Sequence, residues 1–351
     1  MKDPMKNQMR IMTERPLNAE TPVKSLRSWI TPNAVFFDRN QGAIPRRRIS
    51  LARWRLTVEG EVATSLTFTF DEIHRMPKAI AADTLECSGN GRSLLAEKSA
   101  GNPWTIGGVG NAVWGGVWLK DVLGKAGLKP DAGHVAFEGF DKPLGSAGVK
   151  FIRSIPLAKA LSTTLLAYEM NGEPLPLKHG FPLRALALGW TGANCVKWLK
   201  RIVVSDRPHA GFFMDSVYRV FQKGQGPGTG EVVTGIKLKS IITQPASGET
   251  LPAGTVVVLG AAYAGEAEVV RVEVSLDGGA SWNPAGFIGP SEPFAWRQWQ
   301  YIWATAAAGE YLLMSRATDS QGRQQPMQAA WNSLGYGNNG VREHAVNVVV
   351  V

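Results

Sequence analysis

The chain has few cysteines, and their scarcity excludes two kinds of protein. Only Cys87 and Cys195 occur among its 351 residues, so a framework of several disulfides is impossible. A single bridge between the two is open to the sequence, but two reduced thiols are the simpler interpretation. Two thiols also cannot supply an iron–sulfur cysteine set, and the chain has no haem-attachment motif.

Long apolar runs are missing as well. No stretch reaches the roughly 20 apolar residues that a membrane span needs. Residues 1–22 are polar and charged, without the apolar core of a secretory signal. We therefore expect a cytoplasmic protein, with the mature form of an exported protein as the alternative.

The chain is basic but lacks the features of a nucleic-acid binder. Lys and Arg number 38 against 29 Asp and Glu, which gives a net charge of +9. The sequence has no lysine-rich tail and no basic helix with interleaved aromatics, and residues 46–48 form only a short arginine run. Because a positive excess attracts anions of any kind, we expect a small anionic substrate or an acidic carrier and no nucleic-acid role.

The length and the pattern of apolar runs predict two domains after an arm. We expect an extended N-terminal arm over residues 1–33, which contain three prolines and little periodicity. Residues 34–233 mix strand-like runs with short helical ones and predict an α+β domain. The expected helices of this domain are residues 71–76, 118–123 and 155–161.

Residues 234–351 change character and predict an all-β sandwich of the immunoglobulin-like type. Residues 276–279 read LDGG and give a hairpin-type turn. The two-cysteine clamp of antibody domains is absent. The strand-like runs are residues 237–242, 255–263, 269–276, 295–301, 311–318 and 341–351.

The segment TLECSGNGRS at residues 84–93 is the strongest candidate for chemistry. It places Cys87 after an apolar run and before a turn in which Gly89 and Gly91 allow close backbone approach or a positive φ. Arg92 brings a fixed positive charge that favours a thiolate, and a thiolate is a soft ligand for a transition metal. The alternative is a cysteine buried as a small hydrophobic residue.

Four further segments accompany this one in a definite order. They are FFDRNQGAIP at 36–45, AYEMNGEPLP at 167–176, HGFPLR at 179–184 and GANCVKWL at 192–199. Together with residues 84–93 they resemble the sulfite oxidase family of molybdenum enzymes, which also includes the molybdenum domain of plant nitrate reductase. The resemblance extends from about Phe36 to the C-terminus. It implies a molybdopterin-binding catalytic domain followed by a domain that forms a homodimer.

The resemblance also implies roles for individual residues. Cys87 would be the protein ligand to molybdenum, Arg39 and Arg92 would hold an oxyanion, Trp104 would line the pocket, and Tyr218 would place its hydroxyl near the metal. Guanidinium groups suit oxyanions because they donate parallel hydrogen bonds and stay charged. The positions that match pterin-binding places are Phe37, Asp38, Arg39, Asn40, Gln41, Asp141, His179, Arg184, Cys195, Val196 and Lys197.

The sequence departs from the family at three places. Gln41 and Cys195 stand where animal sulfite oxidases have histidine. Residues 331–337 read WNSLGYG, where members that act on sulfite resemble WNLRG, so a third pocket arginine is missing. Arg297 and Arg342 are candidates to replace it.

We therefore expect a molybdenum-molybdopterin oxidoreductase that converts sulfite to sulfate by oxygen-atom transfer and passes electrons to an external one-electron carrier. The nearest alternative keeps the cofactor and acts on nitrate, a sulfoxide or a sulfane. A second alternative is a non-catalytic binding protein whose sandwich mediates contacts.

Overall fold

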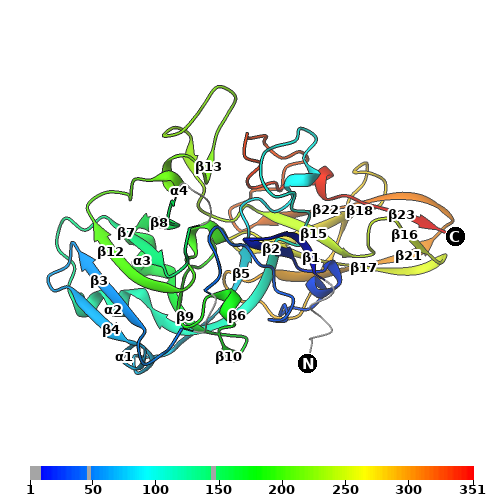
Figure 1. Cartoon of the computed structure of the whole chain (residues 1–351). Coiled ribbons are helices and arrows are strands. Elements are labelled where there is room, and N and C mark those ends of the chain that lie inside the picture. The colour runs from blue at the N-terminus through cyan, green and yellow to red at the C-terminus, as the bar shows by residue number, and fades with distance from the viewer. Residues whose placement is uncertain (1–8, 46–48, 144–147) are drawn as a thin grey trace.

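A computed structural model describes residues 9–45, 49–143 and 148–351, and the short arginine run at 46–48 lies outside these residues. Figure 1 shows two bodies side by side, one of sheets with short helices and one built of strands. The predicted fold class, an α+β domain followed by a β-sandwich, is confirmed.

The first domain contains two five-stranded sheets. One has the order β4-β3-β12-β7-β8, and β3 pairs with β12 in parallel while the other neighbours are antiparallel. Its strand β3 alternates buried and more open positions, and the buried side chains Leu56 and Val58 belong to the main apolar core. The strands are β3 (Arg55–Gly60), β4 (Leu66–Thr69), β7 (His134–Gly139), β8 (Ile152–Pro156) and β12 (Leu199–Ser205).

The other sheet of this domain delivers the candidate cysteine. Its path is β10-β9-β6-β5, with β11 also paired to β9. All of its pairings are antiparallel. Its strands are β5 (Ala79–Glu86), β6 (Val109–Trp118), β9 (Thr164–Met170), β10 (Glu173–Pro174) and β11 (Arg184–Ala187). Because β5 ends at Glu86, Cys87 is the first residue beyond the sheet.

The helices of the first domain are short. Two of them begin and end within three residues of the predicted positions. In α1 (Phe70–His74), Thr69 and Glu72 form a capping box, and α2 (Leu119–Ala126) ends before Gly127, whose φ is 67°. The expected helix at 155–161 is instead α3 (Leu157–Thr163), because Ile155 is paired with Val135 in the sheet. A fourth helix, α4 (Phe212–Asp215), lies in the long loop that follows β12.

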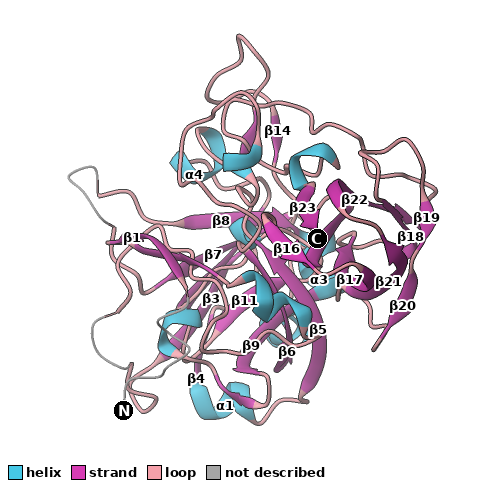
Figure 2. Cartoon of the chain, turned by 90° about the vertical axis from the view of Figure 1, so that its right-hand side faces the viewer, coloured by secondary structure: helices cyan, strands magenta, loops and turns pink. Residues whose placement is uncertain are grey.

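The second domain is a sandwich of two sheets around one apolar core. The four-stranded sheet has the order β15-β17-β21-β20, and the five-stranded sheet has the order β16-β23-β22-β18-β19. Figure 2 shows these strands gathered on one side of the molecule. They are β15 (Lys239–Gln244), β16 (Glu249–Leu251), β17 (Gly254–Tyr263), β18 (Val269–Ser275), β19 (Asn283–Pro284), β20 (Gly286–Ile288), β21 (Arg297–Ala306), β22 (Gly309–Asp319) and β23 (Val346–Val350).

The described part of the N-terminal segment contacts both domains. It forms a hairpin of β1 (Arg10–Glu14) and β2 (Leu17–Glu20), followed by the 3-10 helix η2 (Val23–Arg27). A β-bridge joins Ala19 to Asp38 in the first domain, and Arg27 Nε donates to the carbonyl of Thr243, 3.0 Å away, in the second. The boundaries predicted for the arm and the two domains stay predictions.

A buried polar cluster crosses the seam between the domains. The Glu86 carboxylate accepts hydrogen bonds from Lys239 Nζ at 2.5 Å and from the Tyr263 hydroxyl at 2.9 Å, both in the second domain. Asn90 Nδ2 adds a third donor at 3.0 Å. The second domain thereby holds the residue that precedes Cys87.

Candidate active site

The turn after β5 presents Cys87 at the bottom of the first domain's main cavity. The backbone N–H of Cys87 donates to the carbonyl of Gly108 at 2.8 Å, and its own carbonyl accepts from Asn90 at 2.8 Å. Gly91 has a φ of 83°, as the sequence predicted for this turn. A Cβ on Gly89 would lie 2.5 Å from the Arg92 guanidinium, so the glycine makes room for that side chain.

Cys87 is a buried free thiol, only 6% exposed. Burial raises its pKa, while Arg39 and, less strongly, Arg92 act in the opposite direction. Arg92 therefore lowers the pKa of the Cys87 thiol, as the sequence predicted, but the opposing effect of burial on this pKa is larger. A bound metal would remove the proton outright. Cys195 is also free and buried, and burial raises its pKa to about 12, so the structure contains no disulfide between the two.

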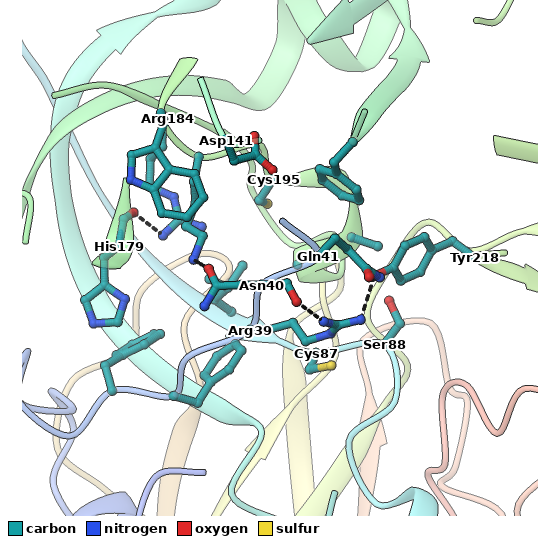
Figure 3. A pocket seen from close by; sticks show the side chains of 18 residues that line it. Arg39, Asn40, Gln41, Cys87, Ser88, Asp141, His179, Arg184, Cys195 and Tyr218 are labelled. Atoms are coloured by element: carbon teal, nitrogen blue, oxygen red, sulfur yellow. Dashed lines mark hydrogen bonds between the residues drawn. The ribbon is translucent and has the colours of Figure 1, made fainter. Parts of the chain in front are cut away.

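Two cavities meet at Cys87. The first, shown in Figure 3, lies between the loops after β2, β5 and β11 and spans about 700 Å³ together with its open mouth. The second is wider, about 1180 Å³ with its mouth, and lies toward α4 and the second domain. Their shared wall consists of Arg39, Gln41, Cys87 and Tyr218.

Most of the predicted cofactor-binding residues line the first cavity. Two do not: the carboxylate of Asp38 is buried against Lys178 Nζ at 3.0 Å, and Val196 packs in the main apolar core. Phe37, Arg39, Asn40, Gln41, Asp141, His179, Arg184, Cys195 and Lys197 all border the cavity.

Positive charge dominates one end of the first cavity. Lys197 Nζ donates to the carbonyl of Lys178 at 2.8 Å and to the side-chain oxygen of Asn40. Burial lowers the pKa of Lys197 to about 7; attraction to Asp38 opposes this shift in part, and the weaker repulsion from Arg184 adds to it. Burial also places the pKa of His179 well below its ordinary value.

Arg184 is the most deeply buried of these cations and is only partly satisfied. Its Nη1 donates to the carbonyl of His179 at 2.9 Å, and its guanidinium carbon lies 5.0 Å from the centre of the Trp114 ring. Its Nε has no hydrogen-bond partner among the described residues. Burial lowers the pKa of Arg184 to about 10. A buried guanidinium that has an N–H donor without a hydrogen-bond acceptor is well suited to bind an anion.

The shared wall is held together by the Tyr218 hydroxyl. Gln41 Nε2 donates to this oxygen at 2.6 Å, and Arg39 Nη2 lies 3.5 Å from it (Figure 3). Arg39 Nη1 is fixed by Asn18 Oδ1 at 3.1 Å, from the N-terminal hairpin. Tyr218 adopts a φ of 57°, a left-handed conformation that is rare for a bulky residue and gathers at functional sites.

The second cavity contains Arg92 and Trp104, the two remaining predicted residues. Trp104 is fully buried. Arg92 Nε donates to the carbonyl of Leu334 and Nη1 to that of Asn102, each at 2.9 Å. Its guanidinium carbon also lies 5.3 Å from the centre of the Tyr336 ring.

Sequence reasoning missed the wall that the second domain contributes. Leu334 and Tyr336 border the second cavity, and the Tyr336 ring stacks on that of Tyr218 at 5.5 Å. The only signal in the sequence was the departure at residues 331–337, where the family pattern has an arginine. Neither Arg297, whose Nη1 is held by Ser291 Oγ at 2.7 Å, nor the exposed Arg342 borders either cavity. Asn18, from the N-terminal hairpin, was missed as well.

These side chains fit an anionic, metal-bearing cofactor. Among the described residues no three His, Cys, Asp or Glu side chains gather into a metal cage, so Cys87 would hold a metal whose other ligands come from the cofactor itself. The cations Arg39, Lys178, Arg184 and Lys197 exceed the nearby carboxylates Asp38 and Asp141. A phosphate would balance that excess and would occupy the idle Arg184 donor.

Comparison with known proteins agrees with this geometry. Residues 41–213 match the oxidoreductase molybdopterin binding domain, and residues 231–349 match the Mo-co oxidoreductase dimerisation domain. None of the described helices has the length and apolar character to cross a membrane.

Full-length relatives give the same result. The chain is 38% identical to mitochondrial sulfite oxidase of Rattus norvegicus over 99% of its own length and 67% of that protein. It is 37% identical to sulfite oxidase of Gallus gallus, over 93% and 75%. The sulfane dehydrogenase SoxCD from Paracoccus pantotrophus superposes with a TM-score of 0.85 at 28% identity, covering 98% of this chain and 91% of that one.

Proposed function

The chain belongs to the sulfite oxidase family of molybdopterin oxidoreductases, and from this premise we propose that it oxidises sulfite to sulfate. The observation that carries the proposal is the buried thiol of Cys87, which lies where a cation-lined cavity meets a wider one. The balanced reaction is SO₃²⁻ + H₂O → SO₄²⁻ + 2H⁺ + 2e⁻. When bound, the molybdenum cofactor supplies oxygen-atom transfer coupled to a two-electron change.

We assign the first cavity to the cofactor. Arg184, Lys197 and His179 would hold its phosphate, supported by the idle Nε of Arg184 and by the lowered pKa of Lys197. A phosphate within hydrogen-bond distance would keep Lys197 charged. Cys87 would ligate the metal as a thiolate, as suits a soft donor.

We assign the second cavity to the substrate. Arg39 and Arg92 would hold the oxyanion, because Nη2 of Arg92 makes no hydrogen bond with the described residues and Nη2 of Arg39 has only the long contact to Tyr218. Trp104 would exclude water from one side of the anion. The Tyr218 hydroxyl accepts from Gln41, which leaves its own proton to be donated toward the substrate.

The partners of the reaction follow from the same assignment. The electrons would pass one at a time to an external acceptor, since the sequence contains no haem or iron–sulfur motif of its own. The match of residues 231–349 to a dimerisation domain supports a homodimer, which light scattering of the purified protein would test. A cytoplasmic location stays a prediction, which cell fractionation would test.

The experiment that tests this function measures metal and turnover on one sample. Protein from a host that makes the cofactor is analysed for molybdenum by mass spectrometry and then assayed for sulfite-dependent reduction of ferricyanide. We expect about one molybdenum per chain and turnover with sulfite. Molybdenum without turnover on sulfite would contradict the substrate, and absence of molybdenum would favour the non-catalytic alternative.

A further inference from the structure

The second cavity has more room and more apolar wall than sulfite requires. Its interior volume of about 510 Å³ lies within the roughly 300–1,000 Å³ of pockets that hold organic ligands. Sulfite has four heavy atoms and no apolar part. A site of this size beside the reaction centre therefore has space for a substituent on the sulfur atom.

The wall that would face such a substituent is aromatic. Phe212 and Phe213 of α4 pack edge to face with ring centres 5.2 Å apart, and Phe212 is 49% exposed at the mouth. Tyr336 and Tyr218 form a stacked pair deeper in, and Val217 lies between the two groups in the chain. Aromatic faces and edges of this kind bind flat apolar groups.

The positive charge that is free to bind a substrate is limited. Among the described residues that line this cavity, Arg39 and Arg92 are the only cations and none is a carboxylate. Two of the three guanidinium nitrogens of Arg92 are already bound to the carbonyls of Leu334 and Asn102. Arg39 Nη1 is bound to Asn18. The unbonded Nη2 of Arg92 and the Nη2 of Arg39, which has only the long contact to Tyr218, suit two oxygens that share a single negative charge.

From this combination we infer that the site also oxidises organic sulfinates to sulfonates, an inference that rests on the proposed function of the same site. A sulfinate, R–SO₂⁻, keeps the sulfur lone pair of sulfite but replaces one charged oxygen by a carbon group. Its two oxygens would bind Arg39 and Arg92, and the group R would lie against the aromatic wall.

The reaction balances in the same way as that of sulfite: R–SO₂⁻ + H₂O → R–SO₃⁻ + 2H⁺ + 2e⁻. One sulfur–oxygen bond forms with an oxygen that derives from water, and no bond to carbon breaks. The sulfur loses two electrons, which two equivalents of a one-electron acceptor such as ferricyanide take up. The two protons go to solvent.

The test compares three substrates on molybdenum-loaded enzyme: sulfite, methanesulfinate and benzenesulfinate. We expect turnover of all three, and a KM for benzenesulfinate about two- to tenfold below that for methanesulfinate, because only the phenyl ring uses the aromatic wall. In water enriched in ¹⁸O, benzenesulfonate should gain one heavy oxygen.

A pair of variants locates the binding of the ring. Phe212→Ala should remove most of the preference for benzenesulfinate over methanesulfinate. Phe287→Ala, on β20 and outside both cavities, serves as the matched control and should keep that preference.

The outcomes separate this inference from the proposed function. Turnover of sulfite without either sulfinate, or a phenyl preference that Phe212→Ala leaves intact, overturns the inference alone. Loss of all three activities in molybdenum-loaded enzyme overturns the proposed function as well. Turnover of sulfinates without sulfite supports the inference and overturns sulfite as the substrate.

Discussion

At the scale of single residues, Asp83 is a buried carboxyl group that interacts electrostatically with Arg184 of the first cavity. One carboxylate oxygen accepts from the backbone of Gly189 at 2.8 Å, and the other has no hydrogen-bond partner among the described residues. Burial raises its pKa to about 8, against the weaker opposing effects of that hydrogen bond and of Lys159 and Arg184. Near pH 7 the residue is therefore largely neutral, and it compensates little of the charge on Arg184.

This raised pKa predicts a pH dependence of stability. In the folded state Asp83 keeps its proton up to about pH 8, whereas the unfolded chain releases it near pH 4. The stabilising contribution is complete below pH 4 and is lost as the pH rises toward 8, by up to about 1.4 kcal/mol for each pH unit. Asp83→Asn should lack this loss. Urea unfolding of cofactor-free protein at pH 5, 6 and 7 measures it.

The control is Asp131→Asn, which removes an exposed carboxylate and should give a profile parallel to the unmodified chain. If the pH profile of stability of Asp83→Asn is also parallel to that of the unmodified chain, burial does not raise the pKa of Asp83 as described.

The second prediction at this scale concerns Cys87. Cys87→Ser replaces a soft thiolate with a hard hydroxyl of nearly the same size. Turnover should fall by more than about 100-fold, beyond the 10–100-fold cost of losing an outer partner of a metal ligand. Circular dichroism and thermal unfolding should show an intact fold. Full activity in this variant would end the assignment of Cys87 as the metal ligand.

At the scale of elements, regular patterns in the sequence were sufficient for the long strands and the capped helices. Runs such as residues 255–263 and 134–139 correspond closely to β17 and β7, because alternation along a strand is a local property. The strands β16, β19 and β20 were missed, since two or three residues carry no detectable period. The helix at 155–161 was predicted two residues early because Ile155 pairs with Val135 in the sheet, and α3 begins only at Leu157.

Two glycines of the first domain have opposite roles within their elements. Gly60 ends β3 with a φ of 96°, and a Cβ there would lie 2.0 Å from the carbonyl oxygen of Val204 in β12. Gly124 lies inside α2, and a Cβ added to it would have no other atom within 4 Å. Position 60 therefore requires glycine. At position 124 glycine has no structural advantage and lowers the helix propensity of α2.

Alanine substitutions should therefore move stability in opposite directions. Gly60→Ala should lower the free energy of unfolding by more than about 1 kcal/mol, and Gly124→Ala should raise it by up to about 1 kcal/mol. Urea unfolding monitored by tryptophan fluorescence compares both with the unmodified chain. Equal effects of the two changes would contradict the strained geometry at Gly60.

At the scale of the whole molecule, the seam between the domains stabilises the cysteine turn. Glu86, Lys239 and Tyr263 are all buried and joined by hydrogen bonds. Removing one partner of a buried ion pair leaves the other charge without compensation, which typically costs about 3–5 kcal/mol. This cost is a large fraction of the roughly 5–15 kcal/mol that separates a folded domain from its unfolded state.

Lys239→Met should therefore destabilise the protein by about 3–5 kcal/mol and release molybdenum more readily, because Glu86 adjoins Cys87. The measurements are the thermal midpoint and the molybdenum retained after dialysis. Lys120→Met, on the exposed face of α2, is the control and should change stability by less than about 0.5 kcal/mol. Equal retention in the two variants would show that the seam does not support the metal ligand.

Only part of the site could be predicted from the sequence, because some of its residues come together only through contacts between the two domains. The motifs ordered along the chain contain nine of the predicted residues that border the first cavity, and the family resemblance added Asp141 and Tyr218, which lie outside those motifs. Tyr336 lies more than a hundred residues beyond Tyr218, and no local pattern indicates that their rings stack. Contacts of this kind arise only once the second domain docks.

The docking of residues 331–337 over Arg92 means that both halves of this chain contribute side chains to one cavity. A hybrid that kept the cofactor-holding half and took residues 234–351 from a relative would receive new side chains at the positions of Leu334 and Tyr336. Substrate choice would then be inherited with the half that contains no metal ligand. A lineage could exchange one anion for another while its cofactor chemistry stayed unaltered.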